Sequence, residues 1–282
     1  MRNTFATTLT KLVQRDKDIV LLSGDIGNKM FDSFKEVAPN NFYNCGIAEG
    51  SMMSLASGLG LSGLKPFVYT ITPFLTTRCL EQIKIGACYH KTPITIIGTG
   101  SGLSYAELGA THHSFEDISI LRSLPDIKIL VPSDTQELEY FLTNLKYDNG
   151  PTYIRIGKKG EPDIYKNSLK NNTLSRIIEE GKNIIILSSG PIVYEAIKAA
   201  EILKKEGIHI GIMSLGVVKP LNYDLLNSIS NDYKIWITLE EHSLIGGIGD
   251  AVINYLIETK KIKNIQNEKI GTPDKFIHSL GN

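Results

Sequence analysis

Short apolar runs alternate with longer segments whose apolar positions recur at helical spacing. The predicted strands in the first part of the chain cover residues 19–22, 66–71, 94–97, 127–131 and 152–156. These runs are apolar at nearly every position, which is typical of parallel strands buried on both faces. The predicted helices between them cover residues 5–14, 48–61, 75–88 and 135–145. This pattern predicts an α/β domain with a parallel sheet.

The alternation stops at a polar segment and then begins again. Residues 158–172 read KKGEPDIYKNSLKNN and have the Lys, Asn, Gly and Pro content of a linker. Beyond this segment, the predicted strands cover 183–187, 209–213 and 234–239, and the predicted helices cover 194–206 and 250–259. We therefore predict two doubly wound α/β domains, one spanning residues 1–160 and a smaller one spanning residues 174–282.

The balanced charge and moderate hydropathy of the chain argue against nucleic acid and membrane partners. The 282 residues contain 30 Lys and Arg and 30 Asp and Glu, so there is no net basic field of the kind that attracts nucleic acid or anionic lipid. No segment approaches the roughly 18 consecutive apolar residues of a membrane-spanning helix. The first residues also lack the apolar stretch of a secretory signal. We expect a cytoplasmic protein with no nucleic acid or membrane partner.

Neither the cysteines nor the histidines form a metal-binding motif. The three cysteines lack a CxxC spacing, which argues against a disulfide framework and a structural zinc site; they are Cys45, Cys79 and Cys88. His112 and His113 are followed by Glu116 and Asp117, but this spacing matches no strong zinc motif. We expect no metal site in this chain. Two exposed loop histidines remain the simpler interpretation.

Glu49 is the first candidate for chemistry. It lies in NCGIAEGSMMSLASGLGLSG, at the opening of a predicted helix rich in small and apolar residues. A carboxylate is favoured there by the helix dipole, and many helices begin with Glu for that reason alone. The small residues predict close packing, hence a buried carboxyl group that can share a proton with a ring nitrogen. The residues themselves leave both interpretations open.

Four segments, in order and at suitable spacing, resemble the transketolase family. They are GIAEG at 46–50, PFVYTITPFLTTRCLEQIK at 66–84, GATHHSFEDISILRSLPDIKILVPSD at 109–134 and YIRIG at 153–157. The later LEEHSLIGGIG at 239–249 is similar to the C-terminal domain of the same family. The chain most resembles the C-terminal subunit of a split transketolase and is also similar to 1-deoxyxylulose-5-phosphate synthases. The resemblance implies a pyrimidine-binding domain followed by a transketolase C-terminal domain.

The resemblance implies that the chain binds thiamine diphosphate. In that family the residue at Glu49 hydrogen-bonds N1′ of the aminopyrimidine, which helps the cofactor lose its C2 proton. A phenylalanine matching Phe74 stacks on the aminopyrimidine, just before a pattern formed here by Arg78 and Gln82. Asp25 matches an aspartate near the thiazolium, although a turn aspartate explains it equally well. The implied cofactor-binding residues are Asp25, Glu49, Phe74 and Arg78.

The resemblance also implies a set of substrate-binding residues. The histidine matching His112 faces the hydroxyl and carbonyl groups of the donor, so Glu49 and His112 are the implied catalytic pair. Arg155 matches an arginine that holds a sugar phosphate, and Arg2 matches another, although either could be a solvated charge. Two polar residues of typical relatives are replaced here by Gly100 and Leu108. We therefore expect a substrate other than a standard pentulose phosphate.

The family's diphosphate site is missing from the sequence. Relatives hold the diphosphate through Mg²⁺ bound by a GDG motif in a separate N-terminal domain, and this chain contains no GDG. We expect an N-terminal partner subunit that holds Mg²⁺, in a hetero-oligomer such as a heterotetramer. The implied reaction is transfer of a two-carbon ketol unit between sugars.

Several alternatives to this function remain open. The chain could be a subunit resembling 1-deoxyxylulose-5-phosphate synthase or the β subunit of a 2-oxoacid dehydrogenase E1. It could also be a regulatory subunit without turnover, although an acid at position 49 argues against that. The loops GTGSG and GGIGDA invite a dinucleotide-binding interpretation, but both lack the GxGxxG spacing.

Overall fold

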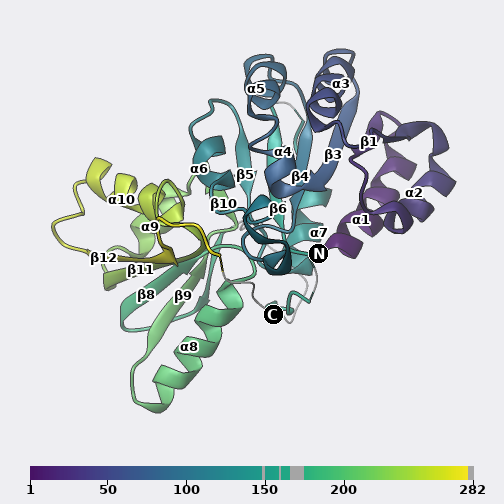
Figure 1. The fold of residues 1–282 in the computed structure, drawn as a ribbon. Coiled ribbons are helices and arrows are strands. Elements are labelled where there is room, and N and C mark those ends of the chain that lie inside the picture. Colours follow the sequence, from purple (N-terminus) through teal and green to yellow (C-terminus); the bar gives the residue numbers. More distant parts are fainter. Residues whose placement is uncertain (148–149, 159, 166–174, 279–282) are drawn as a thin grey trace.

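The chain folds into two α/β units of different size. A computed structural model describes residues 1–147, 150–158, 160–165 and 175–278. Figure 1 shows the larger unit in purple to teal and the smaller unit in green to yellow, each with a sheet between helices. The expected fold class, two doubly wound α/β domains, is confirmed. No helix among these residues is long and apolar enough to cross a bilayer.

The larger sheet has seven strands. In spatial order it runs β10-β5-β6-β4-β3-β1-β2, and every pair except β10 with β5 is parallel. Its strands are β1 (Ile19–Ser23), β2 (Phe42–Asn44), β3 (Lys65–Ile71), β4 (Thr95–Thr99), β5 (Lys128–Leu130), β6 (Thr152–Ile156) and β10 (Val217–Lys219). The central strands β1, β3, β4 and β6 are almost entirely buried, as their continuous apolar runs predict.

Helices cover both faces of this sheet. One face packs against α3 (Glu49–Leu61), α4 (Thr72–Leu75), α5 (Leu80–Gln82), the π-helix η3 (Ile83–Tyr89) and α6 (Asp117–Arg122). The other face packs against α1 (Arg2–Arg15), α2 (Asp32–Val37) and α7 (Thr135–Thr143). Short 3₁₀ helices lie in the connections: η1 (Asn28–Phe31), η2 (Pro39–Asn41) and η4 (Ala106–Thr111). The site-bearing loops follow the carboxyl ends of the strands.

The smaller sheet has five strands in the order β12-β11-β8-β9-β7, with only β7 antiparallel to its neighbour. Its strands are β7 (Arg176–Glu179), β8 (Asn183–Ser188), β9 (Ile210–Ser214), β11 (Tyr233–Ser243) and β12 (Gln266–Thr272). Its helices are α8 (Val193–Lys205), which packs on one face, and α9 (Tyr223–Ile229) and α10 (Ile248–Glu258), which pack on the other. Trp236, fully buried, lies in the core beneath α10.

One sequence-based expectation about secondary structure needs correction. The single helix expected over 75–88 is broken: α4 ends at Leu75, and helical structure resumes only at Leu80. Within the break, Thr76 Oγ1 bonds to the carbonyl of Thr72 and Cys79 Sγ to that of Phe74, contacts that apolar spacing does not encode. In addition, β10 comes from the second half of the chain but joins the first sheet. A strand from the second predicted domain therefore belongs to the sheet of the first. The predicted start of the second domain, residue 174, lies outside the described residues.

A buried ion pair lies where the two units meet. Arg155 on β6 and Asp117 at the start of α6 are 2% and 0% exposed, and Arg155 Nε donates to Asp117 Oδ2 at 2.8 Å. Arg155 Nη2 donates to the carbonyls of Ser114 and Glu241, and Glu241 belongs to β11 of the smaller unit. Burial alone would raise the pKa of Asp117, but the positive charge of Arg155 outweighs it and lowers the pKa. The pair therefore ties three elements together.

We expect Asp117→Asn to destabilise the protein by about 3 to 5 kcal/mol, because the Arg155 cation would remain buried without a counter-charge. Since the pKa of Asp117 is lower in the folded state, the pair's stabilisation is present above the unfolded-state pKa of about 4 and is lost as the pH falls through the folded-state value. Urea unfolding at several pH values measures both effects. Glu139→Gln, which removes an exposed ion pair with Lys11, should cost less than about 1 kcal/mol. Equal stability losses for the two variants would contradict the assignment.

Candidate functional site

The candidate site lies at the carboxyl ends of the larger sheet's strands, where open α/β sheets commonly bind ligands. Three elements build its centre: the start of α3, the broken helix at 72–82, and the loop that follows β4. They bring together Glu49, Phe74, Arg78 and His112. Thus four of the predicted site residues form one continuous set of contacts.

Glu49 is the buried acid of this set. It is the first residue of α3 and is only 4% exposed. Arg78 Nη1 donates to Glu49 Oε2 at 2.6 Å, while the side chain of Arg78 remains 47% exposed. The amide of Gln82 lies against Gly50 in the first turn of α3, and its Oε1 is buried without a hydrogen-bond partner among the described residues. The surroundings of Glu49 thus include an acceptor that no described protein group satisfies.

Phe74 provides a half-buried aromatic face beside Glu49. Its backbone is held in place because Cys79 Sγ bonds to its carbonyl at 3.3 Å. The guanidinium of Arg78 lies over the Phe74 ring, 4.4 Å from the ring centroid. Arg78, which lies within the break in the expected helix, contacts both the Phe74 ring and the buried carboxylate. Departures from regular helix are frequent at functional sites.

His112 reaches the same place from the loop after β4. Its ring meets Phe74 edge to face, with the centroids 5.1 Å apart, and Tyr105 lies 5.9 Å away on another side. Its Nδ1 is 2.9 Å from Thr111 Oγ1. Burial lowers the pKa of His112, and the neighbouring His113 lowers it further. His112 is therefore a neutral hydrogen-bonding group at neutral pH.

His113 points elsewhere. It is 5% exposed, and its Nε2 lies 3.3 Å from the carbonyl of Ala106 within the loop. The simpler interpretation of two exposed loop histidines is thus wrong for His113. Among the described residues, no three His, Cys, Asp or Glu side chains gather closely enough to hold a metal ion.

Asp25 and Arg2 lie at the edges of the candidate site. Asp25 lies after β1 and accepts a hydrogen bond from Asn44 Nδ2 at 3.2 Å, next to the segment that leads into α3. Arg2, the first residue of α1, donates from Nε to the hydroxyl of Tyr69 on β3 at 3.0 Å. Burial raises the pKa of Tyr69, and the charge of Arg2 partly opposes that shift. Neither bond involves Glu49, Phe74, Arg78 or His112, so Asp25 and Arg2 remain candidates by position alone.

Arg155 is placed differently from the expectation. Its guanidinium is buried against Asp117, Ser114 and Glu241, so a sugar phosphate at the surface of the site would find these donors already engaged. A cation closer to His112 is Lys158, three positions further along. Lys158 Nζ lies 4.1 Å from the ring centroid of Tyr105, and its charge contributes to the lowered pKa of His112. Lys158 comes just after β6, a position that the strand-end rule could have identified.

Gly100 and Leu108 also look different in three dimensions. A Cβ on Gly100 would lie 2.0 Å from the Tyr105 ring, so the tyrosine occupies the space that a side chain at position 100 would need. Gly100 also has φ +72°, a conformation that glycine adopts readily. Tyr105 therefore brings a phenol group beside Gly100, whereas Leu108 is 48% exposed and offers no polar group. Of the two positions where a polar residue was expected to be lost, only Leu108 therefore leaves its place without a polar group.

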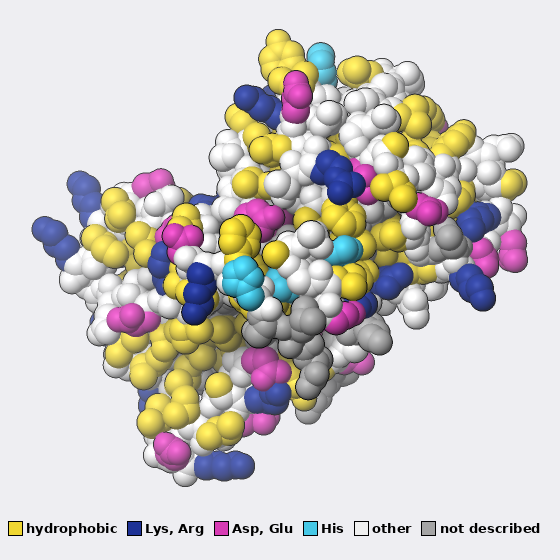
Figure 2. All heavy atoms as spheres, in the orientation of Figure 1, with side chains coloured by type: hydrophobic (Ala, Val, Ile, Leu, Met, Phe, Trp, Pro, Cys, Tyr) yellow, Lys and Arg dark blue, Asp and Glu magenta, His cyan; other side chains and the backbone are white. Residues whose placement is uncertain are grey.

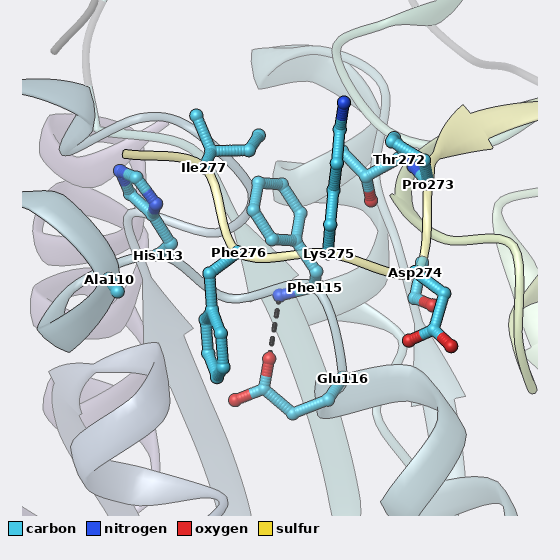
Figure 3. A pocket seen from close by; sticks show the side chains of 11 residues that line it. Ala110, His113, Phe115, Glu116, Thr272, Pro273, Asp274, Lys275, Phe276 and Ile277 are labelled. Atoms are coloured by element: carbon cyan, nitrogen blue, oxygen red, sulfur yellow. Dashed lines mark hydrogen bonds between the residues drawn. The ribbon is translucent and has the colours of Figure 1, made fainter. Parts of the chain in front are cut away.

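A cavity of about 540 Å³ lies behind the loop, between it and the C-terminal segment. Figure 3 shows His113, Phe115 and Glu116 on one side and residues 272–277 on the other. Glu116 accepts a hydrogen bond from the Phe115 amide at 2.8 Å and another from Thr77, the neighbour of Arg78. None of Glu49, Phe74 and His112 lines this cavity. This cavity is therefore distinct from the contact set formed by Glu49, Phe74, Arg78 and His112.

Family comparisons agree with this arrangement. Residues 1–161 match the transketolase pyrimidine-binding domain, and residues 175–279 match the transketolase C-terminal domain. The chain belongs to the transketolase family. The buried acid, the aromatic face and the loop histidine all lie in the part that matches the pyrimidine-binding domain.

Known transketolase-type proteins are similar over nearly the whole chain. An apulose-4-phosphate transketolase subunit of Phocaeicola vulgatus is 33% identical, over 98% of this chain and 88% of that protein. The putative transketolase C-terminal section of Methanocaldococcus jannaschii is 30% identical, over 98% and 87%. The 1-deoxy-D-xylulose-5-phosphate synthase of Halothermothrix orenii is 32% identical over 97% of this chain but only 43% of that enzyme.

A solved transketolase structure has the same two-domain arrangement. The chain described as a split gene transketolase, inactive β4 tetramer, superposes with a TM-score of 0.87 at 31% identity, covering 97% of this chain and 89% of the other. A transketolase mutant from Pichia stipitis, at 17% identity, has a TM-score of 0.78 over 98% of this chain and 41% of its own, and shows the shared fold. The predicted resemblance to a split transketolase subunit is thus confirmed.

We expect the imidazole of His112 to protonate only below its ordinary pKa of 6.5, because burial and the nearby His113 both disfavour the cation. Nitrogen-15 NMR titration of the histidine rings measures this value directly. The signal is assigned by its loss in His112→Asn. A midpoint at or above 6.5 for that signal would contradict the lowered pKa.

Proposed function

We propose that this chain is the part of a thiamine-diphosphate-dependent transketolase that activates the cofactor's aminopyrimidine, with Glu49 as the activating acid. The observation that carries the proposal is the buried carboxylate of Glu49 at the start of α3, bonded to Arg78, whose guanidinium also lies over the half-buried ring of Phe74. When bound, thiamine diphosphate supplies a carbanion equivalent at C2 that accepts and donates the ketol unit. The protein's own residues must bind, orient and protonate it.

The residues fit an aromatic ring with nitrogens at its edge. Phe74 presents an aromatic face, Glu49 can share a proton with a ring nitrogen, and Gln82 Oε1 is a buried acceptor with no donor among the described residues. Arg78 holds Glu49 at 2.6 Å and covers the Phe74 ring, so it orders both groups. An unsatisfied buried acceptor costs about 1 to 3 kcal/mol, which a donor on the ring would recover. Asp25, at the edge of this group, is proposed to face the thiazolium.

Substrate binding is proposed to involve His112, Lys158 and Arg2. The neutral imidazole of His112 can exchange hydrogen bonds with the donor's hydroxyl and carbonyl groups without adding a charge. Lys158 is the cation beside it and is proposed for the role first expected of Arg155, although its Nζ is ion-paired with the exposed Glu107 at 2.7 Å, a partner that a phosphate would have to displace. Sugar phosphates suit such a cation, and a relative from Phocaeicola vulgatus is named for apulose 4-phosphate. A substrate other than a standard pentulose phosphate remains our expectation, based on Leu108.

We propose that a second, N-terminal subunit holds the diphosphate and Mg²⁺. Two relatives are named as one portion of an enzyme, a transketolase subunit and a C-terminal section, and a similar solved chain is described as an inactive β4 tetramer. Apolar side chains are exposed on α3, on η3 and just before α3; they include Ile47, Leu55, Leu61, Ile85 and Tyr89. In Figure 2, the end of the molecule that carries α3 and α5 shows apolar side chains interspersed with polar ones. An exposed apolar surface of this kind suits a protein partner.

The second candidate function is that of a 1-deoxyxylulose-5-phosphate synthase subunit. The 32% identity to such a synthase favours it, since the same Glu49 chemistry would serve both reactions. Coverage favours the transketolase, because the chain spans 88% of the transketolase subunit from Phocaeicola vulgatus but 43% of the synthase. Pyruvate as the preferred donor in place of a ketose would identify the synthase reaction.

We expect Glu49→Gln to lower turnover by about 10² to 10⁴, because the amide fills the same space but cannot share a proton with the ring. Turnover is measured in the enzyme assembled with its partner, Mg²⁺ and thiamine diphosphate. Glu201→Gln, on the exposed side of α8, is the matched control and should leave turnover unchanged. Retention of more than about half the activity by Glu49→Gln would exclude Glu49 as the activating acid.

We expect the purified chain alone to show no ketol transfer, since its aminopyrimidine contacts leave the diphosphate without a metal-bearing site. The test assays the chain alone and after mixing with the candidate N-terminal subunit, with Mg²⁺ and thiamine diphosphate in both. Activity should appear only on mixing. Full activity from the lone chain would refute the requirement for a partner.

A further inference from the structure

The loop that carries His112 is closed at its base. Gly102 and Ser114 exchange two backbone hydrogen bonds, with N to O distances of 3.0 and 3.1 Å, so residues 103–113 form a loop with adjoining ends. Arg155 Nη2 donates to the carbonyl of Ser114 at 3.2 Å from beneath this closure. A loop of this form moves as a unit when its base moves, and the position of His112 therefore depends on the base.

The base of the loop is hydrogen-bonded to the smaller domain as well as to the larger domain that contains it. Glu241, near the end of β11, accepts a hydrogen bond at Oε1 from the amide of Leu103 at 2.7 Å. Two positions further along, the amide of Ser243 donates to the carbonyl of Phe115 at 2.8 Å. One bond is made to Leu103, just after Gly102, and the other to Phe115, just after Ser114. Both come from the end of β11. The smaller domain thus holds both ends of the loop.

Glu241 also fits closely against the base of the loop. A Cβ on Gly102 would lie 2.4 Å from Glu241 Cδ and 2.6 Å from its Oε1, so the carboxylate packs directly on the glycine backbone. Gly102 has φ +59°, which suits glycine at this position. A hydrogen bond from an amide to a carboxylate is stronger than one between neutral groups. Glu241 is therefore the side chain through which β11 is hydrogen-bonded to the start of the loop.

We propose that Glu241 is a positioning residue for His112, holding its loop through the Leu103 amide. The inference rests on the proposed role of His112 in donor binding. In this proposal the smaller domain contributes to the reaction. None of its residues belongs to the contact set of Glu49, Phe74, Arg78 and His112. Glu241 acts on the loop and not on Glu49 or Phe74, so the cofactor contacts should be independent of it.

The first experiment measures the restraint itself. Hydrogen exchange of residues 103–113 is followed by mass spectrometry in the full-length chain, as wild type, Glu241→Ala and Glu241→Gln. Loss of a hydrogen bond to a charged acceptor should raise exchange in the alanine variant by about ten- to thirtyfold. The glutamine variant, whose Oε1 can still accept from Leu103, should stay within about threefold of wild type. Unchanged exchange in Glu241→Ala, or equal exchange in both variants, would overturn the proposal.

The second experiment tests whether the restraint acts through His112. In the enzyme assembled with its partner, Glu241→Ala should lower kcat/KM for the ketose donor by about tenfold, mainly through KM, with rescue in Glu241→Gln. Thiamine diphosphate affinity, read from fluorescence quenching, should not change. In a His112→Ala background, the same substitution should have little further effect.

The possible results separate the two proposals. An equal loss from Glu241→Ala in both backgrounds would overturn the positioning role, because Glu241 would then act elsewhere. Wild-type activity in His112→Ala would instead reject the proposed role of His112, and with it the catalytic purpose of the restraint. Hydrogen exchange would still decide whether Glu241 holds the loop.

Discussion

A guanidinium enclosed by both domains is the constraint on which the arrangement of this molecule depends. Arg155 remains charged under all ordinary conditions, so the fold must surround it with acceptors: the Asp117 carboxylate and the carbonyls of Ser114 and Glu241. Because its donors point in fixed directions, these acceptors are held in one arrangement. That arrangement sets where β11 meets the base of the His112 loop, and through it the geometry at the edge of the site.

The residues of the candidate site fall into two groups, according to which part of the chain positions them. Glu49, Phe74 and Arg78 belong to the first domain, and Arg78 contacts both of the others, so their geometry depends on local packing of α3 against the broken helix. His112 lies on a loop whose start is bonded to Glu241 of the second domain, and Lys158 lies just beyond β6. The two groups of residues can therefore vary independently of each other on the same fold.

Sequence patterns predicted the buried strands well, because each parallel strand carries a continuous apolar run. Glu49 and Phe74 could be identified from ordered motifs, and the structure brings them together. Arg155 could not be distinguished from a surface phosphate ligand by its place in an apolar strand, and its burial depends on Asp117 and on residues far along the chain. The break after Leu75 depends on side chains bonding to nearby carbonyls. The short β10 shows no period of its own.

The position of β10 has a consequence for how the chain is assembled during translation. The edge of β5 in the first sheet stays uncovered until Val217–Lys219 has left the ribosome, although every other strand of that sheet precedes the linker. A nascent first domain therefore carries an open strand edge while β7, β8 and β9 are being synthesised. The first sheet can therefore be completed only after part of the second domain has been synthesised.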